Sequence, residues 1–211
     1  MTKLTCIGDS IRIQYTPRVR EMLGEDFEIY APPENCRYSK FTLRGLYDWK
    51  AAMEGSRIVH WNNGLWDICE LFGDGSFATV EEYTANMTRI ADILLSRHEV
   101  VIFATTTPVS PLNPHTKNAE VKKYNDAVVP LLIERGVIIN DLYSLVAADL
   151  GRYISSDKTH LTEEGIEMCA RAVAECIQKA AQSLPALEQA QSSADTFDDT
   201  GVPIEFTDGK K

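Results

Sequence analysis

Short apolar runs alternate with longer amphipathic segments along most of this 211-residue chain, and this alternation limits the possible folds more than any other feature. Apolar runs rich in β-branched residues predict strands, whereas apolar residues spaced three or four apart predict helices. Strands that alternate with helices form parallel sheets, because each helix returns the chain to the same edge. The pattern predicts a three-layer α/β/α, flavodoxin-like fold with a five-stranded parallel sheet.

The predicted strands cover residues 3–7, 27–30, 57–60, 99–105 and 137–140. The predicted helices cover residues 12–23, 40–54, 79–95, 118–135 and a last segment that begins near residue 162. In open α/β sheets, ligands bind beyond the carboxyl ends of the strands, at a switch point in the strand order. Residues with reactive or polar side chains that directly follow a strand are therefore the first candidates for a functional site.

Residues 1–184 form one predicted domain, and residues 185–211 are a polar, acidic segment without a sustained period, which predicts a flexible tail. The formal net charge of the chain is -10. Such a charge repels phosphate backbones, so nucleic acid is not an expected partner. Composition gives no indication of the oligomeric state.

The five cysteines follow no pairing pattern and form no motif typical of a zinc site, so we expect free thiols and no bound metal. The first residues lack the apolar core of a signal peptide, and no stretch approaches the roughly 20 apolar residues of a membrane span. These features lead to the expectation of a cytoplasmic protein.

Three segments carry candidate chemistry, and each also has a plainer interpretation. Ser10 follows the first predicted strand in Gly8-Asp9-Ser10, where it would be either an exposed nucleophile or only a helix cap. Asp157 and His160 are three residues apart, which suits a base and its orienting carboxylate but also an ordinary surface loop. Asn62 and Asn63 follow the third strand, where an amide could bind an oxyanion or simply form a turn.

Together these segments resemble the sequence blocks of the SGNH (GDSL-like) hydrolase superfamily. Gly8-Asp9-Ser10 is similar to the first block, and Asp157-Lys158-Thr159-His160 to the last, DxxH. The third block, GxND, is degenerate here: His60-Trp61-Asn62-Asn63 places an Asn at position 62 but lacks the Gly and the Asp. A second register, Gly64 to Asp67, would place Trp66 in the Asn position, and we prefer the first register because it keeps a donor.

The second block of that superfamily supplies a Gly whose backbone N–H completes the oxyanion hole. The stretch 35–39 resembles this loop, with Cys36 in the Gly position. The resemblance extends over residues 1–182. It implies an SGNH hydrolase fold, a catalytic triad of Ser10, Asp157 and His160, and an oxyanion hole formed by Ser10, Cys36 and Asn62. Which of the neighbouring amides, Asn62 or Asn63, donates to the oxyanion stays open.

The implied reaction is ester hydrolysis through an acyl-enzyme, with no cofactor. We expect a small-molecule ester as substrate, and an acetylated carbohydrate in particular. A lysophospholipase or thioesterase is the alternative within the enzymes, and a catalytically weak binding protein on the same fold is the alternative outside them. Further candidates for substrate contact, from their positions beside the motifs, are Asp9, Arg37, Tyr38, Asn63, Trp66 and Pro108.

Overall fold

A computed structural model describes residues 1–185 of the chain, and the predicted tail at 185–211 lies almost wholly outside the described residues. Five parallel strands form one sheet in the order β2-β1-β3-β4-β5. Their bounds are Thr2–Ile7 (β1), Phe27–Tyr30 (β2), Ile58–Trp61 (β3), Val100–Ala104 (β4) and Ile138–Asn140 (β5). The predicted α/β architecture and the all-parallel sheet are confirmed.

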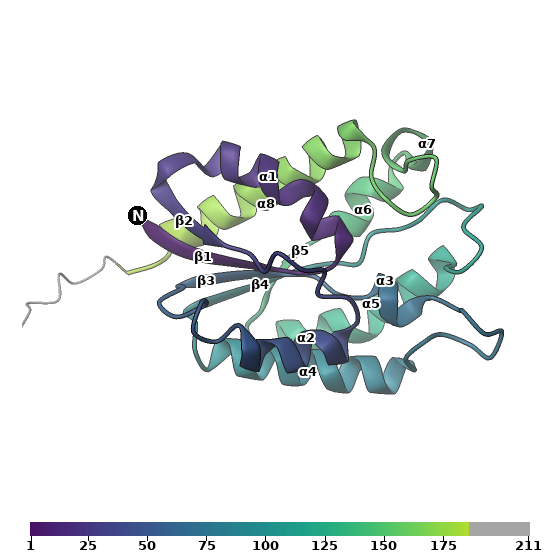
Figure 1. The fold of residues 1–211 in the computed structure, drawn as a ribbon, viewed down its shortest axis with the longest axis horizontal. Coiled ribbons are helices and arrows are strands. Elements are labelled where there is room, and N and C mark those ends of the chain that lie inside the picture. Colours follow the sequence, from purple (N-terminus) through teal and green to yellow (C-terminus); the bar gives the residue numbers. More distant parts are fainter. Residues whose placement is uncertain (186–211) are drawn as a thin grey trace, which may run out of the picture.

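Helices cover both faces of the sheet (Figure 1). One face carries α1 (Ser10–Leu23), α8 (Glu163–Gln182) and the short α6 (Leu142–Ala147). The opposite face carries α2 (Ser39–Asp48), α4 (Val80–Leu95) and α5 (Asn118–Ile133). Because β3 and β4 lie between these layers, their side chains are almost all buried, as continuous apolar runs predict.

Local sequence signals set most helix boundaries. The Thr79 hydroxyl and the Glu82 side chain form a capping box at the start of α4, and Thr162 caps α8 through the backbone N–H of Gly165. Helix α1 ends at Leu23, and its C-cap Gly24, with a φ of 60°, begins a short 3-10 turn, Gly24–Asp26. These signals explain why the sequence places the major helices correctly.

Several boundaries and elements differ from the expectations. Helix α1 begins at Ser10 rather than at residue 12, and α2 ends at Asp48 rather than at 54, with turns following. Strand β3 extends to Trp61, whose side chain is fully buried. The sequence pattern does not predict α3 (Leu65–Ile68), α6 or α7 (Leu150–Tyr153), because helices of four to six residues are too short to show a 3.6-residue period.

The strand order places a switch point between β1 and β3. The chain leaves β1 toward β2 on one side and then crosses to β3 on the other. Adjacent crossovers that run to opposite sides leave a crevice at the carboxyl ends of these two strands. Ser10 follows β1 and Asn62 follows β3, so two of the predicted site residues flank this position.

Candidate active site

Ser10 is the first residue of α1, directly after the turn that follows β1. A Cβ atom at Gly8 would lie 1.9 Å from the Asn62 side-chain oxygen, so only glycine permits this close approach of the two segments. Asp9 is the N-cap of α1, and its carboxylate accepts a hydrogen bond from the backbone N–H of Ile11. The backbone N–H of Ser10 has no acceptor among the described residues. It is therefore available to a bound oxygen atom.

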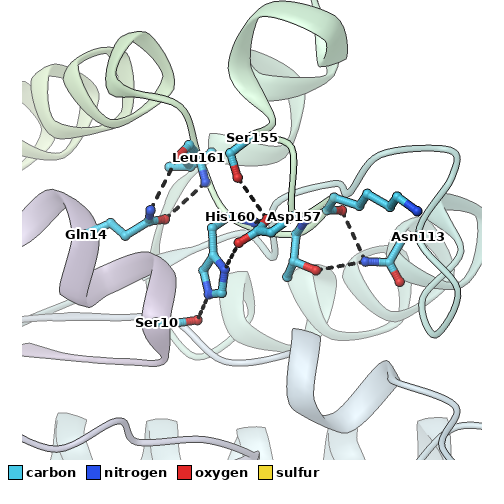
Figure 2. Close-up of polar contacts among 9 residues, drawn as sticks. Ser10, Gln14, Asn113, Ser155, Asp157, His160 and Leu161 are labelled. Carbon is cyan, nitrogen blue, oxygen red and sulfur yellow. Dashed lines mark hydrogen bonds and ion pairs between the residues drawn. The ribbon is translucent and has the colours of Figure 1, made fainter.

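His160 links Ser10 to Asp157, as Figure 2 shows. Its Nε2 lies 2.8 Å from Ser10 Oγ, and its Nδ1 lies 2.6 Å from Asp157 Oδ2. An ionised carboxylate only accepts hydrogen bonds, so Nδ1 carries the proton and the Ser10 hydroxyl donates to Nε2. The fold thus brings together side chains that are up to 150 residues apart in the sequence.

The Asp157 carboxylate also organises its own loop. It accepts hydrogen bonds from the Ser155 hydroxyl and from the backbone N–H groups of Thr159 and His160, at 2.8–2.9 Å. Desolvation raises the pKa of Asp157, but the donated hydrogen bonds outweigh this effect and hold the pKa well below its usual value. Asp157 therefore stays ionised in mild acid, where it continues to orient His160.

Two side chains that the sequence analysis missed fix this loop in place (Figure 2). Gln14 forms two hydrogen bonds with the backbone of Leu161, accepting from its N–H at 3.1 Å and donating to its C=O at 3.3 Å. Asn113 donates to Lys158 O and to the Thr159 hydroxyl. A signal for Gln14 exists in the sequence, because it lies four residues after Ser10 and therefore on the same helix face.

The Asn62 side chain lies beside the Ser10 turn, where its Nδ2 donates to Asp9 Oδ1 at 2.9 Å. Only 5% of Asn62 is exposed. Nδ2 has a second hydrogen atom, which leaves one donor for a bound oxygen. Asp9 itself is buried and engaged by Asn62 and Ile11, and burial raises the pKa of its carboxyl. The expectation that Asp9 contacts substrate is therefore corrected: it caps α1 and orients Asn62.

Asn63 is fully buried, and its hydrogen-bonding groups are used inside the protein. Its Oδ1 accepts from Trp61 Nε1, its Nδ2 donates to Arg37 O, and its C=O accepts from the Tyr83 and Thr106 hydroxyls. Asn63 cannot reach a substrate, so its assignment as a substrate contact is wrong. The same contacts favour Asn62 over Asn63 as the oxyanion donor.

The Cys36 prediction also needs correction. The backbone N–H of Cys36 donates to Gly8 O at 3.1 Å, so it is not free to donate to an oxyanion. The next residues form a turn in which Arg37 has a φ of 50° and donates its N–H to Asn35 Oδ1. The N–H groups of Tyr38, just before α2, and of Lys40, in the first turn of α2, have no acceptor among the described residues.

The other expected contacts differ in their exposure. Arg37 is exposed and lies over the Phe41 ring, and Tyr38 is half-buried against Phe77, with ring centroids 5.2 Å apart. Trp66 is 41% exposed. Pro108, in contrast, is buried. Arg37, Tyr38 and Trp66 are therefore accessible to a ligand, and Pro108 is not.

Among residues 1–185, no helix is long and apolar enough to cross a membrane. In the same part of the chain, no group of three or more His, Cys, Asp or Glu side chains has an arrangement that would hold a metal ion. The five cysteines are free, and Cys6, Cys36 and Cys169 are buried.

No protein-family model and no curated protein sequence matches the chain. Solved structures do match its fold. A lipase/acylhydrolase from Enterococcus faecalis superposes with a TM-score of 0.72 at 17% identity, covering 85% of this chain and 97% of that one. The acetyl xylan esterase AlAXEase gives a TM-score of 0.72 at 16% identity and covers 83% of this chain and 99% of that one.

A member of the lipolytic G-D-S-L family from Veillonella parvula also matches, with a TM-score of 0.68, 14% identity, and coverage of 85% of this chain and all of that one. This chain has the fold of the GDSL hydrolases. The GDSL fold agrees with the resemblance in the sequence blocks. At identities this low, the likeness establishes the architecture, and the chemistry must be argued from the site.

Proposed function

We propose that this chain is a serine esterase that cleaves its substrate through an acyl-enzyme. The observation that carries the proposal is the continuous hydrogen-bonded chain from Ser10 through His160 to Asp157. A serine hydroxyl is a weak nucleophile until a base accepts its proton, and the base needs a partner that fixes its tautomer. The geometry of the three side chains and the charge of Asp157 support these roles.

In the first step, Ser10 Oγ attacks the ester carbonyl while His160 Nε2 takes the hydroxyl proton. Asp157 stabilises the imidazolium that forms. The negative oxygen of the tetrahedral intermediate then accepts hydrogen bonds from the Ser10 N–H and from Asn62 Nδ2. His160 returns its proton to the leaving alcohol, and a water molecule, deprotonated by His160, hydrolyses the acyl-enzyme. Since the Cys36 N–H is occupied, a free N–H at the start of α2, at Tyr38 or Lys40, replaces it.

For the substrate, we propose a small acyl group, such as acetyl, on a carbohydrate. Support comes from the fold neighbour that is an acetyl xylan esterase. A second candidate, a lysophospholipase or thioesterase, is favoured by a different observation. Several large apolar side chains are exposed on the loops that follow β3 and β4, among them Leu71, Phe72 (81% exposed) and Leu112 (74%). Such side chains suit an acyl chain.

The test compares wild type with Ser10→Ala in the hydrolysis of p-nitrophenyl acetate and butyrate. The proposal predicts that Ser10→Ala loses at least about 10³-fold in kcat, because the nucleophile is absent. Arg18→Ala, on an exposed position of the same helix, is the matched control and should retain wild-type turnover. Equal turnover by wild type and Ser10→Ala would show that Ser10 is not the nucleophile. Inactivity of both would favour a binding protein on the same fold.

A further inference from the structure

Asp67 is a buried carboxylate that the mechanism above does not use. It belongs to α3, three residues beyond Gly64, and only 1% of it is exposed. Both of its oxygens accept from the backbone N–H of Ser39, at 2.9 and 3.1 Å, and Oδ1 also accepts from the Ser39 hydroxyl at 2.6 Å. The Ser39 hydroxyl accepts in turn from Asn86 Nδ2 on α4. Asp67 thus holds the first residue of α2.

This contact replaces the usual N-cap of α2. The residue before the helix, Tyr38, makes no side-chain capping bond. A carboxylate at a helix N-terminus satisfies unpaired N–H groups and interacts favourably with the helix dipole. Here, however, the carboxylate comes from α3, in the segment that follows β3, so it also joins two residues that are 28 apart in the sequence.

The two joined segments both contact the turn that precedes Ser10. One follows β3 and contains Asn62, and the other precedes α2 and is bound to Gly8 O through the N–H of Cys36. A second bond between the same segments runs from Asn63 Nδ2 to Arg37 O at 2.8 Å. The two bonds hold residues 37 and 39 against residues 63 and 67. They therefore hold the Asn62 amide at a set distance from the free N–H groups of Tyr38 and Lys40 at the start of α2.

Keeping a carboxylate here has a cost in stability. Burial, and to a smaller extent the Asp9 carboxylate, raise the pKa of Asp67 to about 7 even though Ser39 donates to it. The other titratable groups coupled to it are the hydroxyls of Tyr83 and Tyr124 and the thiol of Cys69. In the described residues, Asp67 has no cationic partner within salt-bridge distance. A neutral side chain would be less costly to bury, which points to a role beyond folding.

We propose that Asp67 is a positioning residue. Its carboxylate holds Ser39 so that the free N–H groups at the start of α2 and the Asn62 amide converge on the oxyanion formed at Ser10. The inference rests on the proposed esterase function. It predicts that Asp67 affects the transition state rather than substrate binding, because its bonds set the placement of donors that act when the carbonyl oxygen becomes negative.

The main test is Asp67→Asn, which keeps one acceptor for Ser39 N–H, loses the other and removes the buried charge. At pH 8 we expect kcat for p-nitrophenyl acetate to fall roughly tenfold, with KM within about twofold. The substitution weakens the contact with Ser39 that positions the oxyanion donors, but it deletes none of these donors. The Ki of butylboronic acid, which mimics the tetrahedral intermediate, should rise by a similar factor. The melting temperature should stay equal or rise, because the buried charge is gone.

Asp74→Asn is the matched control, since Asp74 is exposed in the segment that follows α3. It should leave kcat, KM, the Ki of the boronic acid and the melting temperature unchanged. Ser39→Ala removes only the hydroxyl partner and provides a second variant if Asp67→Asn does not fold. Combining it with Asp67→Asn should give less than additive losses in kcat, as expected for two ends of one contact.

Two results would overturn the inference. One is wild-type kcat and boronate affinity in Asp67→Asn. The other is a loss that burst titration of active sites assigns to fewer active molecules and that parallels a lower melting temperature, as a purely structural role predicts. If Ser10→Ala is inactive and Asp67→Asn behaves like wild type, only the positioning role fails. If wild type itself does not turn over through Ser10, the proposed function and this inference both fail.

Discussion

Gln14 holds the backbone of Leu161 with both ends of its side-chain amide, and so ties the helix that begins with Ser10 to the loop that carries His160. The two residues are 147 apart in sequence. The distance between Ser10 and His160, the proposed nucleophile and base, depends on how these two segments dock. Among the described residues, Gln14 provides a direct polar link between them in addition to the contact of Ser10 with His160.

Replacing Gln14 should therefore impair catalysis more than folding. For Gln14→Ala we expect kcat to fall about tenfold with little change in KM, because a misplaced base costs rate more than binding. Steady-state hydrolysis of p-nitrophenyl acetate measures this effect, with Arg18→Ala one helical turn further on as the control. Unchanged kcat in Gln14→Ala would mean that the catalytic loop is positioned by other contacts, such as those of Asn113.

Asn62 is a second residue whose replacement should lower kcat more than it changes KM. In Asn62→Ala, the loss of one proposed oxyanion donor should lower kcat about 10²–10³-fold, as deletion of such a donor does in a characterised serine protease. The deletion also leaves Asp9 with one donor fewer, so the melting temperature of the variant must be compared with that of wild type. A kcat within threefold of wild type in a folded Asn62→Ala protein would remove Asn62 from the oxyanion hole.

The sequence predicted the sheet well, because strands depend on local signals, and apolar runs identified all five of them. Ser10, Asp157 and His160 were chosen from two short motifs, and the structure brings their side chains within hydrogen-bond distance of one another. Their catalytic roles stay a proposal. The residues around the proposed oxyanion hole were predicted less well. Whether the N–H of Cys36 is free depends on its bond to Gly8 O, and whether Asn63 reaches a ligand depends on Tyr83 and Thr106 from later elements. Contacts between distant segments leave no local pattern to detect.

His60 should make the fold sensitive to acid. It is fully buried at the end of β3, and burial lowers its pKa from 6.5 to about 3. A histidine with a lowered folded-state pKa favours the fold while neutral, and this advantage is lost as pH falls below the unfolded-state pKa. Linkage gives a loss of about 2 kcal/mol between pH 7.5 and 5.

The prediction is tested by comparing the free energy of unfolding at pH 7.5 and 5 in wild type and in His60→Phe. The variant should lose less stability on acidification by roughly that amount, whatever its stability at pH 7.5. The comparison of pH differences cancels any packing cost of the larger ring. Identical pH dependence in the two proteins would mean that His60 is not the responsible group.

Acyl-chain preference distinguishes the two substrate candidates. If a small acyl group is the natural one, kcat/KM should fall at least about tenfold from p-nitrophenyl acetate to octanoate, because the longer chain gains no apolar subsite. Phe72→Ser should leave the acetate-to-octanoate ratio unchanged, like the control Tyr47→Ser, which alters an exposed aromatic on α2. Preference for octanoate that is lost in Phe72→Ser but kept in Tyr47→Ser would favour the lysophospholipase or thioesterase candidate.

The most direct test of the central claim is to trap the covalent intermediate. The protein is treated with a fluorophosphonate, digested, and examined by mass spectrometry for the modified residue. We expect one phosphonylated residue, Ser10, with slow or no labelling in His160→Ala, because the base that activates the hydroxyl is missing. Labelling at another residue, or labelling of Ser10 at the same rate in wild type and His160→Ala, would contradict it.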